Sequence, residues 1–138
     1  MLKSKENGGE KMAKSIIQTN KECLISTATC NLQQHHIFNG VAYRKKSEKY
    51  GLKVWLLDGW HQNTKYSVHK DKVFRLALKK LGQIFFEEHY GHDKFIKEFN
   101  KDYLAIPFNP INCPVDRLEQ SLGARFLLLK YPKIGEIK

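Results

Sequence analysis

Two adjacent histidines, His35 and His36, are the residues whose type and spacing could carry chemistry. Imidazole titrates near neutral pH and also binds divalent metals, so each ring could serve as a general base or as a metal ligand. Neighbouring residues on a strand point to opposite faces, but at a bend one ring can hold a metal while the other activates water. The pair therefore suits metal-dependent phosphodiester hydrolysis; the alternative is that both rings are structural or lie at the surface.

Two further histidines, His61 and His69, follow along the chain. His61 comes 25 residues after His36, a separation that a β-hairpin and a turn can close. We therefore consider His61 a second candidate metal ligand, the alternative being a solvated residue at a helix start. His69 flanks an expected helix without a visible partner, so we expect it to have no role in the site.

The chain is strongly basic: its 138 residues include 24 Lys and Arg against 14 Asp and Glu, a net charge of +10. Such a balance favours an anionic partner, most often a nucleic acid. The basic residues are concentrated rather than spread evenly. One group lies within ten residues, directly after the histidine pair, and consists of Arg44, Lys45, Lys46, Lys49 and Lys53.

The elements around the histidines follow a simple order. Residues 32–38 predict a short strand, and Asn39-Gly40 is a strong turn signal. Residues 41–51 predict a basic loop or short helix, and the mostly apolar residues 52–57 predict a second, buried strand. A short helix is expected over about 59–65. Strand, loop, strand and helix is the order of a ββα-metal motif.

The rest of the chain is predicted to be mostly helical. Apolar residues at helical spacing predict a helix over 71–90 that ends at Gly91, and a second helix over about 92–100. Prolines interrupt the chain from residue 105 onward, where we expect a short helix near 115–122. Residues 126–129 are expected to be a strand or a docking segment.

The polar residues 1–20 are expected to form a flexible tail, in which Met12 is an alternative to Met1 as the natural start.

Between about Met12 and Leu104 the chain resembles small phage-encoded HNH nuclease-like proteins, which often accompany recombination genes. The resemblance rests on short motifs distributed along this part of the chain: Cys23-x-x-Ser26, Asn31-Leu32-x-x-His35-His36-Ile37-Phe38-x-Gly40, Arg44-Lys45-Lys46-Ser47-Glu48-x-Tyr50-Gly51, Val54-Trp55-Leu56, Val68-His69 and Asn100-x-x-Tyr103-Leu104. It implies an α+β fold, a ββα-metal core followed by C-terminal helices, with the HNH-like domain and its helical extension over 21–104. Residues 105–138 match nothing in that family and form an extension of unknown role.

The resemblance also implies roles for single residues. His35 and His61 would bind a divalent metal such as Mg²⁺ or Mn²⁺, and His36 would be the general base acting on a DNA phosphodiester. The basic residues of the loop would contact DNA phosphates, which position DNA without reading its sequence. These are Arg44, Lys45, Lys46 and Lys49.

The chain departs from the family at a structural zinc site, which the members build from a Cys-x-x-Cys and a Cys-x-x-His pair. Only Cys23 remains, while Ser26, Leu57 and Trp60 occupy the other positions. Tetrahedral zinc needs four nitrogen or sulfur donors, so we expect no structural zinc. Leu57 and Trp60 could replace the metal with apolar packing.

Three functions remain open on these grounds. The first is a metal-dependent DNA endonuclease, and the second is a catalytically inactive descendant that binds nucleic acid or inhibits a host defence nuclease. The third is a nucleic-acid-binding accessory factor in recombination, and a host or phage protein partner is compatible with each. No run approaches the roughly 20 apolar residues of a membrane span, and the three sparse cysteines argue against a disulfide framework, so a cytoplasmic setting is expected.

Overall fold

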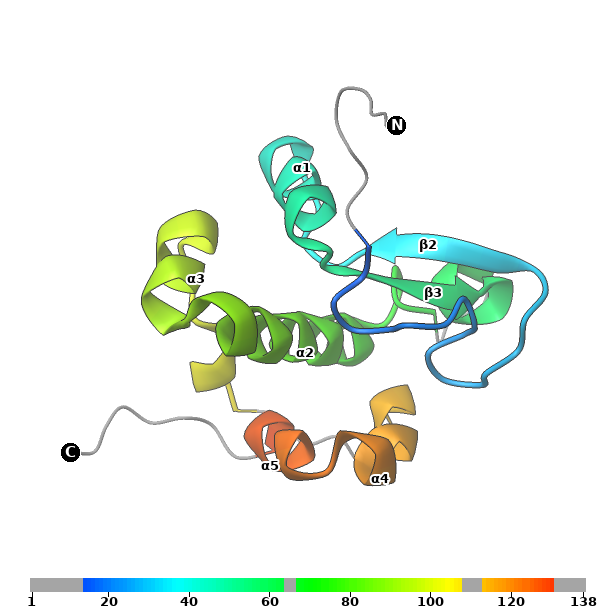
Figure 1. Cartoon of the computed structure of the whole chain (residues 1–138). Coiled ribbons are helices and arrows are strands. Elements are labelled where there is room, and N and C mark those ends of the chain that lie inside the picture. Colours follow the sequence, from blue (N-terminus) through cyan, green and yellow to red (C-terminus); the bar gives the residue numbers. More distant parts are fainter. Residues whose placement is uncertain (1–13, 64–66, 108–112, 131–138) are drawn as a thin grey trace.

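The computed structural model describes residues 14–63, 67–107 and 113–130. In these ranges the chain combines helices with a two-stranded antiparallel sheet, which confirms the expected mixture of helix and strand. Figure 1 shows the long helix α2 (Lys72–Tyr90) across the middle of the molecule, with the hairpin on one side of it. Helices α4 (Glu119–Leu122) and α5 (Ala124–Lys130) lie on the other side. None of the described helices has the length and apolar character needed to cross a membrane.

The sheet consists of β2 (Leu32–His36) and β3 (Lys53–Leu57). Its register pairs His35 with Val54 and Gln34 with Trp55. Alternation therefore turns Val54 and Leu56, which are buried, toward α2, whereas Trp55 faces the other way. Both predicted strands are present, and the first ends at His36, two residues earlier than predicted.

The connection between the strands is helical. Helix α1 (Val41–Tyr50) occupies the segment predicted as a basic loop or short helix. It ends at Gly51, whose φ of 71° lies in the left-handed region that glycine adopts without strain. The buried hydroxyl of Ser47 donates to the carbonyl of Phe38 and accepts from its N–H, which fixes α1 against the end of β2.

Part of the N-terminal segment is attached to the hairpin. The hydroxyl of Ser15 donates to the carbonyl of Lys53 at 2.7 Å, and the N–H of Ile16 donates to the carbonyl of Gly51 at 3.0 Å. The N–H of Trp55 in turn donates to Oε1 of Gln18 at 2.7 Å. Residues 14–20 of the expected flexible tail are thus hydrogen-bonded to β3 and the residues before it, while residues 1–13 lie outside the described part of the chain.

After β3 the chain forms a single π-helical turn, η1 (Gly59–Asn63), within the segment predicted as a short helix over 59–65. The described chain resumes at Ser67, and helix α2 follows close to its predicted limits. Its N-cap is Asp71, whose carboxylate accepts hydrogen bonds from the N–H groups of Val73 and Phe74. Gly82 of α2 packs closely against Ile37 and Phe38, so this helix covers the inner face of the hairpin.

Helix α3 (His92–Phe99) follows α2, as predicted, and contributes Phe95 and Phe99 to an aromatic cluster with Phe38 and Phe86. Beyond it lie short helical turns, η2 (Tyr103–Ala105) and η3 (Pro114–Leu118), and then α4, where the short helix near 115–122 was expected. Residues 126–129, expected to be a strand or a docking segment, do not form a strand, while the docking alternative agrees with their contacts. This segment belongs to α5, which contacts α2 and buries Phe126 and Leu129, because its apolar residues are satisfied by packing on a helix rather than by strand pairing.

Candidate metal centre

Three histidines from separate elements meet on the inner side of the hairpin: His35 from β2, His61 from η1, and His69 from the turn before α2. Each offers one ring nitrogen, and these nitrogens lie within 4.8 Å of one another. Nε2 of His61 and Nε2 of His69 are 2.9 Å apart. The predicted ligands His35 and His61 are therefore brought together, and His69, for which no role was expected, joins them.

The backbone holds the two later histidines in place. The N–H of Val68 donates to the carbonyl of Trp60, which joins the turn that carries His69 to η1. The guanidinium of Arg75 donates to the carbonyls of Val68 and His69 from one turn inside α2. The start of the long helix thus fixes the position of His69 beside His61.

Hydrogen bonds orient the rings for metal binding. Nδ1 of His61 lies 2.6 Å from Oε1 of Gln33, which as an acceptor takes the Nδ1 hydrogen and leaves the Nε2 lone pair directed at His69. His35 is only 2% exposed, and its Nε2 is a buried polar atom without a hydrogen-bond partner among the described residues. A buried ring nitrogen of this kind is costly unless something binds it. This nitrogen lies near two further imidazoles, and a metal ion bound by the three rings could satisfy it.

The electrostatics keep all three rings neutral, the form that binds metals. The pKa of His35 is lowered to about 3, mainly by burial and to a smaller extent by the charges of His61, His69, His36 and Lys79. Burial and the neighbouring His69 also lower the pKa of His61, against an opposing effect of Asp58. The pKa of His69 is lowered by burial and by Arg75. The site needs no deprotonation step to accept a cation near neutral pH.

The distances and donor types fit one ion. Two nitrogens bound to a tetrahedral zinc at about 2.0–2.1 Å lie roughly 3.4 Å apart, a value between the observed 2.9 Å and the upper limit of 4.8 Å. His35 and His61 are buried, while His69 is exposed, so the cluster opens to solvent on one side. Three protein ligands and an open position are typical of catalytic rather than structural metal sites.

His36, the predicted general base, does not join this cluster. Its ring lies on the opposite face of β2, where Nε2 is 2.7 Å from Oε1 of Glu48 in α1. The other carboxylate oxygen of Glu48 accepts from Nζ of Lys53, also at 2.7 Å. The structure therefore places the candidate base in a His36–Glu48–Lys53 chain on the outer face of the hairpin, and no bend in the strand brings it beside His35.

The predicted phosphate-contacting residues all lie on α1. Arg44, Lys45 and Lys49 are exposed. Lys46 instead reaches α3, donates to the carbonyl of Glu98 at 2.6 Å and lies 3.5 Å from its carboxylate. Three of the four side chains are thus placed to meet a ligand from solvent, while Lys46 joins two helices.

The positions that the resemblance assigns to a structural zinc site carry other interactions. Sγ of Cys23 accepts a hydrogen bond from the N–H of Ser26 at 3.4 Å. Against the opposing effect of burial, this bond and the nearby backbone of Leu57 help to lower the pKa of the buried thiol. Trp60 packs edge-on against Phe74, and the guanidinium of Arg117 lies over its ring. The positions that would supply zinc ligands therefore make other contacts: Trp60 packs against its neighbours, and Cys23 is hydrogen-bonded.

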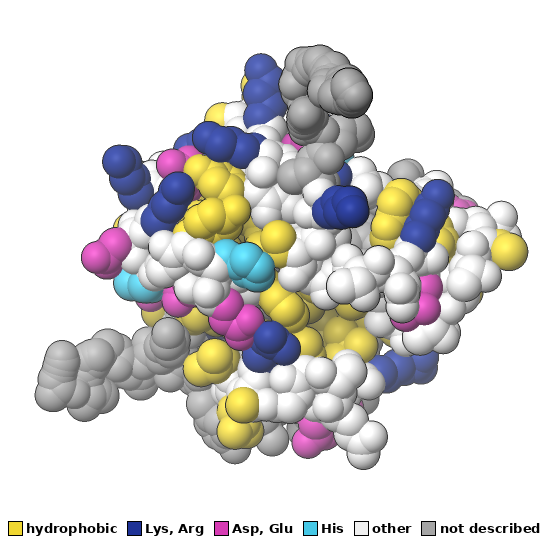
Figure 2. All heavy atoms as spheres, viewed as in Figure 1, with side chains coloured by type: hydrophobic (Ala, Val, Ile, Leu, Met, Phe, Trp, Pro, Cys, Tyr) yellow, Lys and Arg dark blue, Asp and Glu magenta, His cyan; other side chains and the backbone are white. Residues whose placement is uncertain are grey.

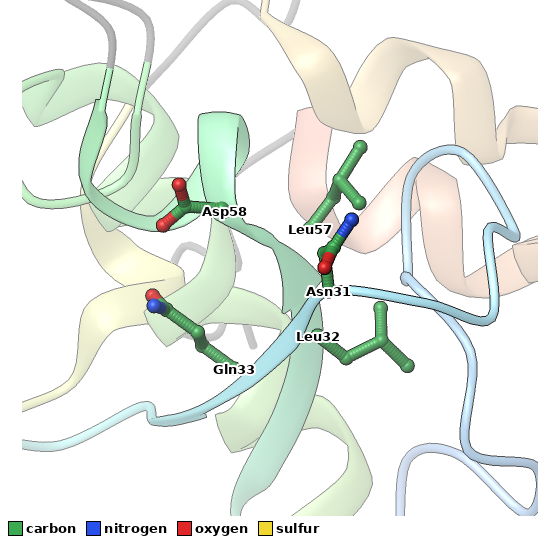
Figure 3. A pocket seen from close by; sticks show the side chains of 5 residues that line it. All are labelled: Asn31, Leu32, Gln33, Leu57 and Asp58. Atoms are coloured by element: carbon green, nitrogen blue, oxygen red, sulfur yellow. The ribbon is translucent and has the colours of Figure 1, made fainter.

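A cavity of about 460 Å³ adjoins the histidines at the end of the hairpin. Figure 3 shows the side chains of Gln33 and Asp58 on one side of it, with Leu32 and Leu57 on the other. Gln33 also binds His61, so the polar wall of the cavity is continuous with the cluster. Gln33 therefore links the lining of this cavity to His61.

Sequence reasoning missed His69 because its partner is eight residues away across a turn, a separation that matches neither helix nor strand periodicity. The one available signal was the count of histidines between the second strand and the long helix.

Comparison of the chain with protein-family models, curated proteins and solved structures gives no match. The functional argument therefore rests on the chain's own residues.

Proposed function

We propose that the chain is an HNH-like DNA-binding protein that holds a divalent transition metal between His35, His61 and His69 and hydrolyses DNA phosphodiesters. The observation that carries the proposal is the buried, unpartnered Nε2 of His35 beside two further neutral imidazoles. When bound, the ion would act as a Lewis acid on a phosphate oxygen.

The donor set narrows the choice of metal. Mg²⁺ prefers oxygen ligands, and Mn²⁺ shares much of that preference, whereas imidazole suits Zn²⁺, Ni²⁺ and related ions. Three imidazoles without a carboxylate therefore favour a transition metal over the Mg²⁺ or Mn²⁺ that the family resemblance implied. This ion would be distinct from the structural zinc of the family, for which Ser26, Leu57 and Trp60 supply no ligand.

Two structural features support an HNH-type core. The hairpin, with η1 directly after β3, has the order that such a core needs, and its metal-binding histidines come from the first strand and from the residues after the second. Cys23 lies beside Leu57, as it would if both positions once belonged to one zinc site. The net charge of +10 and the exposed Arg44, Lys45 and Lys49 support DNA as the partner, in the expected cytoplasmic setting.

Within this proposal His36 is the base that the resemblance implies, although its ring lies on the face of β2 opposite the metal cluster. Glu48 binds its Nε2, which leaves Nδ1 to accept a proton, and the carboxylate would stabilise the imidazolium that forms. Lys53 keeps Glu48 ionised and in place. The position of His36 on the face opposite the cluster favours a second candidate function. This is a catalytically inactive descendant that binds metal and nucleic acid or blocks a host defence nuclease.

One set of variants tests the proposal. Purified protein is titrated with Co²⁺, whose visible absorption reports tetrahedral coordination, and is then assayed for nicking of supercoiled plasmid with Zn²⁺, Ni²⁺, Co²⁺, Mn²⁺ or Mg²⁺. His35→Gln, His61→Gln and His69→Gln should each abolish the absorption band, while His89→Gln and His92→Gln, on exposed histidines of α2 and α3, should keep it.

The two candidate functions give different results in the nicking assay. Nicking that is lost in both His36→Ala and His61→Gln supports the nuclease. A stoichiometric Co²⁺ band together with no nicking by any metal would select the inactive, metal-binding descendant. Absence of the band in the wild-type protein would overturn the metal centre itself.

A further inference from the structure

A second cavity, of about 510 Å³, lies on the outer face of the hairpin, away from the histidine cluster. Gln34 and Trp55, which pair across the strands, face it because their neighbours His35 and Val54 face inward. The N-terminal segment over residues 14–21 forms its other wall. In Figure 1 this segment, in dark blue, starts near the end of β2 and passes across the hairpin beside β3.

The two walls are joined by hydrogen bonds, so the cavity is a defined feature of the fold. Ser15 donates to the carbonyl of Lys53, and the side chain of Gln18 accepts from the N–H of Trp55, each at 2.7 Å. Nε2 of Gln18 also donates to the carbonyl of Glu22, which closes the segment on itself. The shape of the cavity is therefore set by hydrogen bonds at both ends of the wall.

The lining of the cavity is basic. Lys14, Lys21 and Lys53 contribute to it, and among the described residues that line it none is acidic. Nζ of Lys53 is held by Glu48, so its charge is compensated, whereas Lys14 and Lys21 are exposed and form no ion pair within the described ranges. Figure 2 shows lysine and arginine side chains over α1 and over the hairpin on this face. Two uncompensated cations at the rim suit an anionic group.

An aromatic side chain, that of Trp55, also lines the cavity. Trp55 is half-buried, and Nζ of Lys21 sits 4.7 Å from the centroid of its ring. A lysine over a partly exposed indole is held weakly, and a nucleobase stacks on such a ring more strongly than the ammonium does. A nucleobase can therefore displace the Lys21 side chain from the Trp55 ring, and the ammonium group of Lys21 can then contact the phosphate attached to that base.

We propose that this cavity binds one nucleotide of a single-stranded nucleic acid, with its base stacked on Trp55 and its phosphate contacted by Lys14 and Lys21. The inference rests on the nucleic-acid binding of the proposed function but uses none of the metal-centre residues. A stacked base must be unpaired, which selects a single strand over a duplex. The cavity volume falls in the usual range of about 300–1,000 Å³ for small-ligand sites, and Asn20 and Gln34 can bond a base edge.

Fluorescence of Trp55 tests the assignment directly. The chain has two tryptophans, so Trp60→Phe leaves Trp55 as the only emitter. We expect hexathymidylate to quench this emission in the presence of EDTA, which removes any contribution of the metal centre. In the converse variant, Trp55→Phe with Trp60 retained, the same oligonucleotide should cause no quenching.

Charge variants separate this site from general attraction to a basic protein. In the Trp60→Phe background, Lys14→Gln with Lys21→Gln should weaken hexathymidylate binding about tenfold or more. The matched pair Lys72→Gln with Lys97→Gln, which removes two exposed lysines elsewhere, should weaken it less than about threefold. An abasic hexamer of equal charge should bind about tenfold more weakly and cause no quenching.

The inference is overturned if the Lys14 and Lys21 pair has no larger effect than the matched pair, or if the abasic chain binds as well as the oligonucleotide. A hexaglutamate peptide that binds with equal affinity and quenches Trp55 would also overturn it, in favour of an acidic protein ligand. If the oligonucleotide binds without quenching Trp55, and this binding is lost in the double variant Lys45→Gln with Lys49→Gln, the result refutes only the cavity. Nucleic-acid binding would then take place at α1. Quenching in a protein whose histidine cluster is intact but binds no Co²⁺ refutes only the metal centre.

Discussion

His35 and His36 are consecutive in the chain, yet their rings lie on opposite faces of β2. The ring of His35 is 5.3 Å from that of His61 and 5.2 Å from that of His69, whereas Nε2 of His36 is 2.7 Å from Glu48. The strand thus separates a face that carries the three-histidine cluster from a face that carries the His36–Glu48–Lys53 chain and the outer cavity. The two faces can be tested independently.

Metal binding should stabilise the folded chain. A ligand present at a hundredfold excess over its Kd adds about 2.7 kcal/mol, which for a domain of this size raises the Tm by about 5–10 °C. We expect Zn²⁺ to raise the Tm of the wild type by this amount, and His61→Gln to remove the shift, as measured by differential scanning fluorimetry. An equal shift in His61→Gln and His89→Gln would show that the ion binds elsewhere.

Glu48→Ala should lower the free energy of unfolding by about 2 kcal/mol, because the side chain of Lys53 is only 6% exposed and would lose its carboxylate. Glu88→Ala breaks the exposed pair with Arg125 and should cost less than about 1 kcal/mol. Urea denaturation of the two variants makes the comparison. Equal losses would mean that the Glu48–Lys53 pair is screened by solvent.

The contribution of Glu48 should also depend on pH. Burial raises its pKa, but hydrogen bonds from Lys53 and His36 outweigh this and hold the pKa below its ordinary 4.5. A carboxylate with a lowered folded pKa stabilises the fold above the unfolded pKa and loses that contribution as pH falls through the folded one. The stability difference between wild type and Glu48→Ala should therefore shrink below about pH 4.5, and a difference that stays constant to pH 3 would contradict the ion pair.

Lys80 should make the free energy of unfolding depend on pH in the alkaline range. It is fully buried, donates to the carbonyls of Tyr103 and Ile106, and has its pKa lowered by burial from 10.5 to about 8. Since the folded pKa is the lower one, the folded chain sheds this proton first, and stability relative to Lys80→Met rises between about pH 8 and 10.5. From pH 7 to 9.5 urea denaturation should show a relative gain of about 2 kcal/mol. A flat difference would mean that Lys80 stays charged in the fold.

Gly51 should tolerate no side chain. A Cβ there would lie 2.2 Å from the carbonyl oxygen of Lys14, in addition to requiring a φ of 71°. We expect Gly51→Ala to cost about 2–4 kcal/mol in urea denaturation, more than the roughly 1–2 kcal/mol of a left-handed residue alone. Asn tolerates a left-handed φ, so Gly51→Asn serves as the control. If Asn restores stability, backbone conformation rather than contact with the N-terminal segment makes glycine necessary.

Local patterns were sufficient for most of the secondary structure. Alternation and turn residues predicted the two strands, and the 3.6-residue spacing of apolar side chains, with Asp71 and Gly91 as boundaries, predicted α2. These signals are short-range, so they can be read from neighbouring residues. The same rules left 126–129 undecided, because a run of Leu suits either a strand or a helix and only contact with α2 decides between them.

The sequence by itself determined that histidines and basic residues flank a strand–connection–strand unit, and it singled out His35 and His61 as possible ligands. Only the tertiary structure decided which rings meet. The turn before α2 brings His69 to His61, the pleat of β2 turns His36 away to Glu48, and residues 14–21 close a basic cavity over Trp55. Each of these contacts joins segments whose separation matches no local period, so it depends on how the elements pack and not on the spacing of residues along the chain.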